Sequence, residues 1–293
     1  MSESSPPSSS SLAPVGRLGL RLSVIVTTYN NPRALSLVLA CLARQTLPEF
    51  ELLVADDGSG DPTRSLIEGF ARRVPFPVRH VWHPDAGFQK CAILNKAILA
   101  AAGDYLIFFD GDVLAPSRCI ERHVRAARRG TYLAGGKIDL LEPMASRITE
   151  RDIEGGILER VGSWWRHLNK PRRFLASYVP GVRDWLDGWV PREPSWRGEN
   201  SSAFKEDLLR VDGFDERFTH GFDDADFGHR LQAAGVHGRS IRYTCPVFHL
   251  DHPRPYSNHE QISANKALYD QNRLTGVVGT DFGIRKGTHQ QRV

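Results

Sequence analysis

The sequence predicts an α/β fold in which a mostly parallel central sheet carries helices on both faces. Two observations support this fold class. Between residues 22 and 110, short apolar runs alternate with segments whose apolar residues recur at helical spacing. Such alternation is typical of parallel strands joined by helical crossovers. Polar residues also cluster directly after three of the apolar runs, at the sheet edge where open α/β folds bind ligands.

Each element of the first half follows from its local pattern. Residues 22–27 (LSVIVT) form a β-branched run, which indicates a buried strand. Asn30 and Asn31 supply a cap for the helix that follows, and Gly103 ends a later one. The remaining predicted strands are 51–55, 78–82 and 105–109, and the predicted helices are 32–45, 62–73 and 92–102.

The pattern changes after residue 112. Residues 150–190 are rich in Trp, Arg and Pro and show poor periodicity, whereas 201–209 return to an ordered pattern. Around them, helices are predicted over 116–129 and 226–234, and strands over 132–138 and within 239–248. We expect a disordered Ser/Pro-rich tail over 1–20, a single domain over 21–275 and a C-terminal tail over 276–293.

Composition argues against several classes of function. The chain has 293 residues, 41% hydrophobic and 25% charged, as in ordinary soluble domains. Its formal charge of +4 is too small to indicate nucleic-acid binding and fits an anionic ligand or membrane surface. No apolar run is long enough to span a bilayer, and residues 1–15 lack the pattern of a secretory signal. The four cysteines show no metal-ligand spacing, so we expect free, mostly buried thiols in a reducing cytoplasm.

Two carboxylates follow the predicted strand 105–109. Asp110 and Asp112 are two residues apart, so in an extended segment both side chains point to the same side. Paired carboxylate oxygens suit a divalent cation, which in turn neutralises a diphosphate. A lone Asp-x-Asp is more often a turn that caps the next helix. The clusters after the neighbouring strands favour the metal-binding interpretation.

Those clusters lie after the first two predicted strands. Thr27 and Tyr29 offer a hydroxyl group and an aromatic ring that can bind and stack on a nucleotide base. Asp56 offers a carboxylate for the imide N–H of uracil or for ribose hydroxyls. Taken alone, either cluster also fits a polar turn. Three polar clusters at the ends of three strands of one sheet converge on a single crevice, which is much more specific.

Three motifs carry a resemblance to a known family: SVIVTTYN (23–30), ADDGS (55–59) and FDGD (109–112). The chain resembles the inverting family 2 glycosyltransferases of GT-A fold over residues 22–256. The resemblance implies that Thr27, Tyr29 and Asp56 hold the uridine of a UDP-sugar. It also implies that Asp110 contacts ribose and metal and that Asp112 ligates Mn²⁺ or Mg²⁺.

The segment GFQKCA (87–92), followed by Asn95, is similar to the region before the metal motif in bacterial chondroitin-polymerase modules and galactosyltransferase-like enzymes. By that resemblance Gln89 and Asn95 line the nucleotide side. An equal alternative for Asn95 is a helix residue that makes a structural hydrogen bond.

The second half contains the motifs RGENSSAF (197–204), VDGFDE (211–216) and GFDDADFGHRL (221–231). They look like a galactosyltransferase-type C-terminal segment, in which Gly-Gly-Asn precedes an acidic pair that opens a helix. Here Glu199 stands in place of the second glycine, and the acidic pair is Asp223-Asp224. The resemblance implies that Asn200 and Asp223 bind acceptor or sugar hydroxyls.

An inverting transfer needs a general base that takes the proton of the acceptor hydroxyl. The resemblance points to Asp224 for this role, since a carboxylate at a helix N-terminus stays ionised. The alternative is that the acidic residues only cap and charge the helix. Asp226 and Arg230 have i,i+4 spacing, which predicts an ion pair on the helix surface.

His249 follows an apolar strand and is predicted to be a further metal ligand, because a neutral imidazole suits Mn²⁺. His252 is its competitor. The Trp- and Arg-rich segment 160–196 fits three interpretations: a lid that binds the acceptor, a docking surface for a lipid-linked acceptor or membrane, and core packing.

The function implied is metal-dependent, inverting transfer of a sugar from a UDP-sugar to a hydroxyl of a glycan or lipid-linked acceptor, as in polysaccharide biosynthesis. A galactose or N-acetylgalactosamine donor is favoured. Residues 21–115 would form the nucleotide-binding half and 116–275 the acceptor and catalytic half. We expect a cytoplasmic protein or one bound peripherally at the inner face of the cell membrane.

Two other functions are weighed. A sugar nucleotidyltransferase is disfavoured because TTYNNP (27–32) stands where those enzymes have a Gly-rich basic loop. A non-catalytic binding subunit is disfavoured because the expected metal-binding and catalytic side chains are intact.

Overall fold

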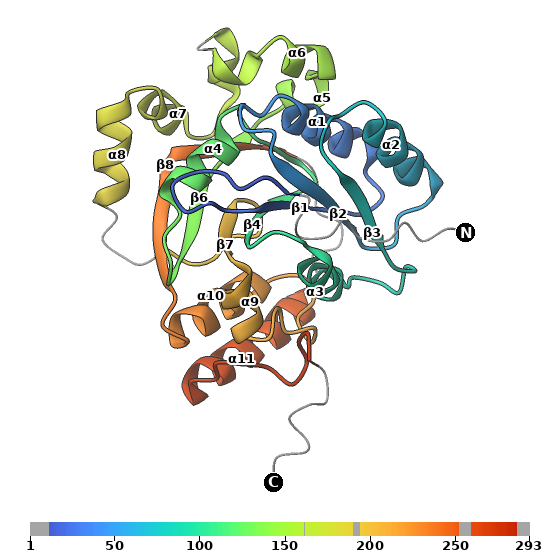
Figure 1. The fold of residues 1–293 in the computed structure, drawn as a ribbon, viewed down its shortest axis with the longest axis vertical. Coiled ribbons are helices and arrows are strands. Elements are labelled where there is room, and N and C mark those ends of the chain that lie inside the picture. The colour runs from blue at the N-terminus through green and yellow to red at the C-terminus, as the bar shows by residue number, and fades with distance from the viewer. Residues whose placement is uncertain (1–11, 161, 190–193, 252–258, 286–293) are drawn as a thin grey trace.

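The strands of the protein form an eight-stranded sheet. The computed structural model describes residues 12–160, 162–189, 194–251 and 259–285. The strand order is β3-β2-β1-β4-β7-β6-β8-β5 (Figure 1). Four of the seven neighbouring pairs in this order are parallel, which confirms the predicted α/β class with a mostly parallel sheet. The strands are β1 (Leu22–Thr28), β2 (Phe50–Asp56), β3 (Val78–Trp82), β4 (Tyr105–Asp110), β5 (Val113–Leu114), β6 (Thr131–Leu140), β7 (Ser201–Phe204) and β8 (His237–Leu250).

Helices cover both faces of the sheet (Figure 1). Successive residues of β1 face opposite sides: Val24 and Val26 join the core layer under α1, α2 and α4, whereas Ile25 joins the layer that contains α3, α9 and α10. The helices are α1 (Pro32–Ala43), α2 (Asp61–Ala71), α3 (Lys90–Ala100), α4 (Cys119–Ala126), α5 (Met144–Arg147), α6 (Glu150–Glu154), α7 (Pro171–Ser177), α8 (Pro180–Gly188), α9 (Lys205–Arg210), α10 (Asp223–Ala233) and α11 (His259–Thr275).

The parallel strands align the polar clusters. β1 lies between β2 and β4, and Thr27 is in register with Ala55 on one side and with Asp110 on the other. Thr28 pairs with Asp56 in the same ladder. The carboxyl ends of the three strands therefore meet at one edge of the sheet, as the sequence predicts.

The strands of the second half join the same sheet through antiparallel pairing of β7 with both β4 and β6. The long β6–β8 pair shifts register between Gly135 and Gly136. A Cβ at Gly135 would lie 2.1 Å from the Asn200 side chain, and one at Gly136 would lie 2.3 Å from the Arg242 carbonyl oxygen. Glycine is needed at both positions, because the buried Asn200 side chain fills the space beside Gly135 and the backbone of β8 fills that beside Gly136.

The segment with poor periodicity is more ordered than its pattern indicates. Residues 150–188 form α6, α7, α8 and two 3₁₀ turns at Ile157–Glu159 and Ser163–His167. Trp164 and Phe174 pack on Phe248 of β8, with ring centroids 5.2 and 5.7 Å from it. Their order comes from contacts with β8, far along the chain, which a local pattern does not reveal.

Both tails contain packed residues. In the predicted disordered tail 1–20, the described part (12–20) forms a backbone bridge between Val15 and Leu20, and both side chains are buried. Beyond residue 275, the backbone N–H of Ile284 donates to the Asp212 carbonyl oxygen at 2.9 Å. In the described part of the chain, no helix is long and apolar enough to cross a membrane.

Candidate active site

Asp110 is the centre of the polar edge. Its Oδ1 accepts a hydrogen bond from the Thr27 hydroxyl at 3.0 Å and contacts the Lys90 ammonium at 2.8 Å. Lys90 opens α3, so this contact ties the helix to the end of β4. Thr27 and Asp110, both predicted from sequence, are thus side by side, together with a lysine that was not singled out.

Asp56, at the end of β2, lies in a network of hydrogen bonds. It is fully buried, its Oδ2 lies 2.7 Å from Nε2 of His80, and its Oδ1 accepts the backbone N–H of Ser59 at 2.8 Å. The pKa of Asp56 is lowered because these contacts outweigh the opposing effect of burial. Both carboxylate oxygens have protein partners that shape the loop after β2, and each can accept a further hydrogen bond, so the contact of Asp56 with uridine stays a prediction.

The other predicted nucleotide contacts line the same edge. Tyr29 is half exposed, and its hydroxyl donates to Asp85 at 2.9 Å. Gln89 is exposed just before α3, and its backbone N–H donates to Asp57 at 2.9 Å. Asp57 also contacts His83 at 2.7 Å. It therefore anchors the 83–89 segment, a role that the sequence analysis missed.

Two predicted contacts are structural residues. Asn95 is buried and binds the backbone of Phe214 through both ends of its amide, at 2.8 Å each. This is the second of its two predicted roles. Asn200 is fully buried: its Nδ2 donates to the carbonyl oxygens of Gly136 and Cys245, and its Oδ1 lies 2.9 Å from His123. Asn200 joins β6 to β8 and is not available to a sugar, contrary to its predicted role.

Asp223 and Asp224 open α10 and are half-buried. The backbone N–H of Gly198 donates to Asp224 Oδ2 at 2.8 Å, and a Cβ on that glycine would lie 3.0 Å from the carboxylate. Phe222 directly precedes the pair at φ 66°, a left-handed conformation that strains a bulky residue and sets the direction of the helix start.

Electrostatics link the acidic pair to the nucleotide edge. Burial, together with repulsion from Asp223, raises the pKa of Asp224 well above its usual value, and the Lys90 ammonium opposes that rise. Burial also raises the pKa of Asp223. Burial alone would lower the pKa of Lys90, but the carboxylates around it, Asp110 foremost, raise it. Lys90 thus carries a positive charge between the two halves of the site.

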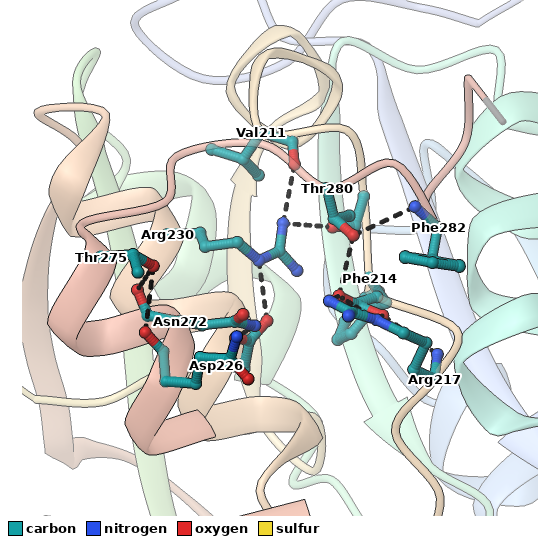
Figure 2. A network of polar contacts seen from close by, with 12 residues as sticks. Val211, Phe214, Arg217, Asp226, Arg230, Asn272, Thr275, Thr280 and Phe282 are labelled. Atoms are coloured by element: carbon teal, nitrogen blue, oxygen red, sulfur yellow. Dashed lines mark hydrogen bonds and ion pairs between the residues drawn. The ribbon is translucent and has the colours of Figure 1, made fainter. Parts of the chain in front are cut away.

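A buried network holds α10 in place (Figure 2). Asp226 and Arg230 form the predicted ion pair at 2.7 Å, but both are fully buried, so its predicted position on the helix surface is wrong. Arg230 donates to the carbonyl oxygens of Val211 and Gly213, and Asn272 of α11 donates to Asp226 at 2.7 Å. The i,i+4 spacing is common on helix surfaces, but here α11 and the 211–213 loop cover it.

The predicted metal ligands also meet. His249 Nε2 lies 3.5 Å from Asp112 Oδ2, because β5 pairs with β8 so that Val113 is opposite His249. Asp139 of β6 lies 3.3 Å from the other ring nitrogen of His249. A carboxylate and an imidazole are a donor set that suits Mn²⁺, and Asp139, on the opposite nitrogen of the ring, can orient the imidazole. His252 lies outside the described residues.

Comparison with known proteins identifies the family. A family model described as "Glycosyl transferase family 2" matches residues 23–182, more than half of the chain. The chain belongs to glycosyltransferase family 2. The match covers all three strand-end motifs, which confirms the resemblance described above.

Curated relatives of this family 2 chain are longer than the chain itself. It is 27% identical over 243 residues to a chondroitin synthase from Escherichia coli, covering 75% of this chain and 33% of the relative. It is 32% identical over 233 residues to a validoxylamine A glucosyltransferase from Streptomyces hygroscopicus subsp. jinggangensis, covering 73% and 52%. The chain thus spans one third to about half of these relatives.

Solved structures show the fold. A mannosyltransferase from Pyrobaculum calidifontis, in complex with GDP-Man and Mn²⁺, matches with a TM-score of 0.56 and 19% identity over 91% of this chain and 74% of that one. TarS from S. aureus matches with a TM-score of 0.51 and 15% identity, over 86% and 39%. The family 2 chain therefore has the predicted GT-A fold.

Three side chains at the site of this family 2 domain were not singled out from sequence: Asp57, Lys90 and Asp139. Asp57 directly follows Asp56, which was the residue chosen from the same motif. Asp139 alternates with Ile138 and Leu140 at the end of a strand, which is a signal for a polar side chain at an edge. Lys90 lies within the GFQKCA motif, but only Gln89 was chosen there, because a lysine in the first turn of a helix is ordinary.

Proposed function

We propose that the domain transfers a sugar from a UDP-sugar to a hydroxyl of a glycan or lipid-linked acceptor, with inversion at the anomeric carbon. The observation that carries the proposal is the position of Asp224. It is a half-buried carboxylate at the start of α10, linked through the charge of Lys90 to Asp110 at the nucleotide edge. One crevice then holds donor and acceptor together.

In this scheme the Asp224 carboxylate takes the proton of the acceptor hydroxyl as its oxygen bonds to the anomeric carbon. The bond from that carbon to the β-phosphate oxygen breaks on the opposite face, and UDP departs with the electron pair. Asp112 and His249 would hold Mn²⁺ or Mg²⁺, which supplies charge neutralisation for the diphosphate. Tyr29 and Thr27 would bind the uridine, and Asp223 would bind acceptor hydroxyls.

A galactose or N-acetylgalactosamine donor remains our first choice, on the strength of the galactosyltransferase-type motifs at 197–231. The proposal is tested by nucleotide release from a panel of UDP-sugars and from GDP-mannose, with Mn²⁺ or with EDTA. Mn²⁺-dependent release of UDP from one sugar is expected. Release from GDP-mannose alone would overturn the uridine assignment. Binding of UDP without turnover over a broad acceptor panel would favour a binding subunit.

Removal of the metal ligand Asp112 should separate metal binding from nucleotide binding. Loss of a residue that only supports a metal ligand costs about 10- to 100-fold in metal affinity, so Asp112→Ala should weaken Mn²⁺ binding by at least that factor. Calorimetric titration with Mn²⁺ in the presence of UDP measures it. Asp61→Asn, at an exposed carboxylate on α2, is the matched control. Unchanged Mn²⁺ affinity in Asp112→Ala would remove Asp112 from the site.

Lys90→Gln should change the pH dependence of the reaction. Loss of the ammonium removes a charge that opposes the repulsion between Asp223 and Asp224, so the pKa of Asp224 rises further. The acidic limb of the kcat profile is therefore expected to move to higher pH by about one unit. Lys266→Gln, which removes an exposed lysine on α11, should leave the profile in place. A uniform loss of rate at every pH would assign Lys90 a purely structural role.

A further inference from the structure

A group of partly exposed cationic side chains gathers where β6, β8 and the start of α7 meet (Figure 1). The Lys170 ammonium and the Arg173 guanidinium both donate to the carbonyl oxygen of Lys137, at 3.3 Å each. Arg242 of β8 passes beside the preceding glycine, because a Cβ on Gly136 would lie 3.2 Å from the Arg242 Cγ. The cationic group consists of Lys137, Lys170, Arg173, Arg197 and Arg242.

Two carboxylates accompany this group and neutralise only part of its charge. Asp139 Oδ1 lies 3.8 Å from the Lys137 ammonium, and Glu199 Oε1 lies 3.4 Å from the Arg197 guanidinium. Among the described residues, no carboxylate lies within ion-pair distance of the other three members, Lys170, Arg173 and Arg242. These three positive charges therefore have no direct counter-charge in the protein.

Repulsion within the group shows that its members are close to one another. Burial lowers the pKa of Arg173, and repulsion from Arg242 and Arg197 lowers it further. Burial and repulsion from Arg173 likewise lower the pKa of Lys170, and attraction to Asp139 offsets this only in part. Arg173 also lies over the ring of Tyr243, 5.7 Å from its centroid, which is a neutral partner. A bound anion would relieve this repulsion.

The cationic group lies between the two ends of the candidate active site. Lys137 and Asp139 are two residues apart on β6, so both side chains point to the same side, and Asp139 contacts His249. Arg197 directly precedes the glycine whose N–H donates to Asp224 at 2.8 Å. An anion bound by the group would thus lie near both the predicted metal ligand and the proposed base.

We propose that Lys170, Arg173 and Arg242 bind an anionic group of the acceptor, a phosphate or a carboxylate. Ammonium and guanidinium groups donate charge-assisted hydrogen bonds to either one. The donor diphosphate fits less well, because the metal ion neutralises its charge in the proposed scheme, whereas the acceptor brings no cation of its own. This inference rests on the proposed function, since it takes Asp224 to mark the acceptor side.

The test uses two pairs of probes, each of which differs only in charge. One pair is a hyaluronan tetrasaccharide and its methyl ester, and the other is N-acetylglucosamine 6-phosphate and N-acetylglucosamine. Calorimetric titration of the full chain is run without nucleotide and again with UDP and Mn²⁺. The anionic member of at least one pair is expected to bind at least tenfold more tightly, as a charge-assisted hydrogen bond predicts. The pair that responds separates a carboxylate from a phosphate.

Arg173→Gln/Arg242→Gln should abolish the preference for the anionic probe and leave the affinity for UDP and Mn²⁺ unchanged. Lys170→Gln, which keeps both arginines, should weaken anionic binding about tenfold. The matched control is Arg172→Gln, which removes the same charge from an exposed side chain next to Arg173 on α7. Thermal unfolding shows whether each variant is folded, and Lys170→Gln carries the test if the double variant is not.

Three outcomes would overturn the proposal. The parent chain could bind charged and neutral probes equally well, or Arg172→Gln could weaken anionic binding as much as the other variants do. The variants could also weaken UDP binding and keep the preference between probes, which would assign the cations to the donor. None of these measurements needs turnover. Absence of UDP release from every sugar would therefore count against the proposed reaction and leave the anion site standing.

Discussion

Replacement of Asp224 by Asn is expected to lower the rate of sugar transfer by about 10²- to 10⁴-fold, the usual contribution of a general base. The amide keeps the shape of the side chain, and its oxygen can still accept the hydrogen bond from the Gly198 N–H. It cannot take a proton from the acceptor hydroxyl. Steady-state UDP release with saturating donor measures the effect, and direct titration of UDP should show unchanged donor binding.

The same substitution has an expected effect of opposite sign on stability. The pKa of Asp224 is raised in the folded protein, so the folded chain holds a proton that the unfolded chain releases above the ordinary carboxyl pKa. Ionisation of Asp224 therefore opposes folding, and stability falls as pH rises through that window. Asn carries no charge at any pH. Asp224→Asn should be at least as stable as the parent at neutral pH, as urea unfolding would show.

A variant with full activity would remove Asp224 from the reaction. A variant that loses both activity and stability would point to a structural role for the carboxylate. Asp61→Asn serves again as the control, because it removes one exposed carboxylate from α2 and should change neither quantity.

Arg230→Met is the second change with a large expected effect, this time on folding. It would leave the buried carboxylate of Asp226 without its charge partner and two loop carbonyl groups without their donor. Removal of one partner of a buried ion pair costs about 3–5 kcal/mol. Urea unfolding followed by tryptophan fluorescence measures the change in free energy.

Arg210→Met is the matched control, because Arg210 is half exposed and pairs with Asp207 three residues before it. A surface pair of this kind contributes about 0–1 kcal/mol. We therefore expect Arg230→Met to lower the free energy of unfolding several times more than Arg210→Met does. Equal, small effects would show that the Asp226–Arg230 network does not hold α10.

The features predicted from the sequence are those that depend on local pattern and on the ends of strands. The strands around Thr27 and Asp110 were located to within a residue or two, because buried parallel strands are short apolar runs with polar ends. Asp112 and His249, 137 positions apart, were chosen for chemistry and family likeness, and the pairing of β5 with β8 brings them together.

What the sequence did not predict depends on long-range packing. The i,i+4 pair of Asp226 and Arg230 looks the same on an exposed helix as on one covered by α11. Asn200 has the polarity of a ligand, but the bend at Gly135 and Gly136 buries it. The role of Lys90 depends on the packing of α3 near the end of β4, which brings its ammonium to Asp110. In each case the deciding neighbour is distant in the chain.

The dependence of α10 on late segments has a consequence for synthesis. Asn272 completes the network around Asp226, and Thr280 donates to Asp215 in the loop that leads to α10. On the ribosome these residues emerge roughly 50 positions after the start of α10. Until then the buried carboxylate of Asp226 lacks one of its hydrogen-bond donors. The strands β1, β2 and β4 are synthesised much earlier, so the acidic start of α10 should be the last part of the site to become ordered.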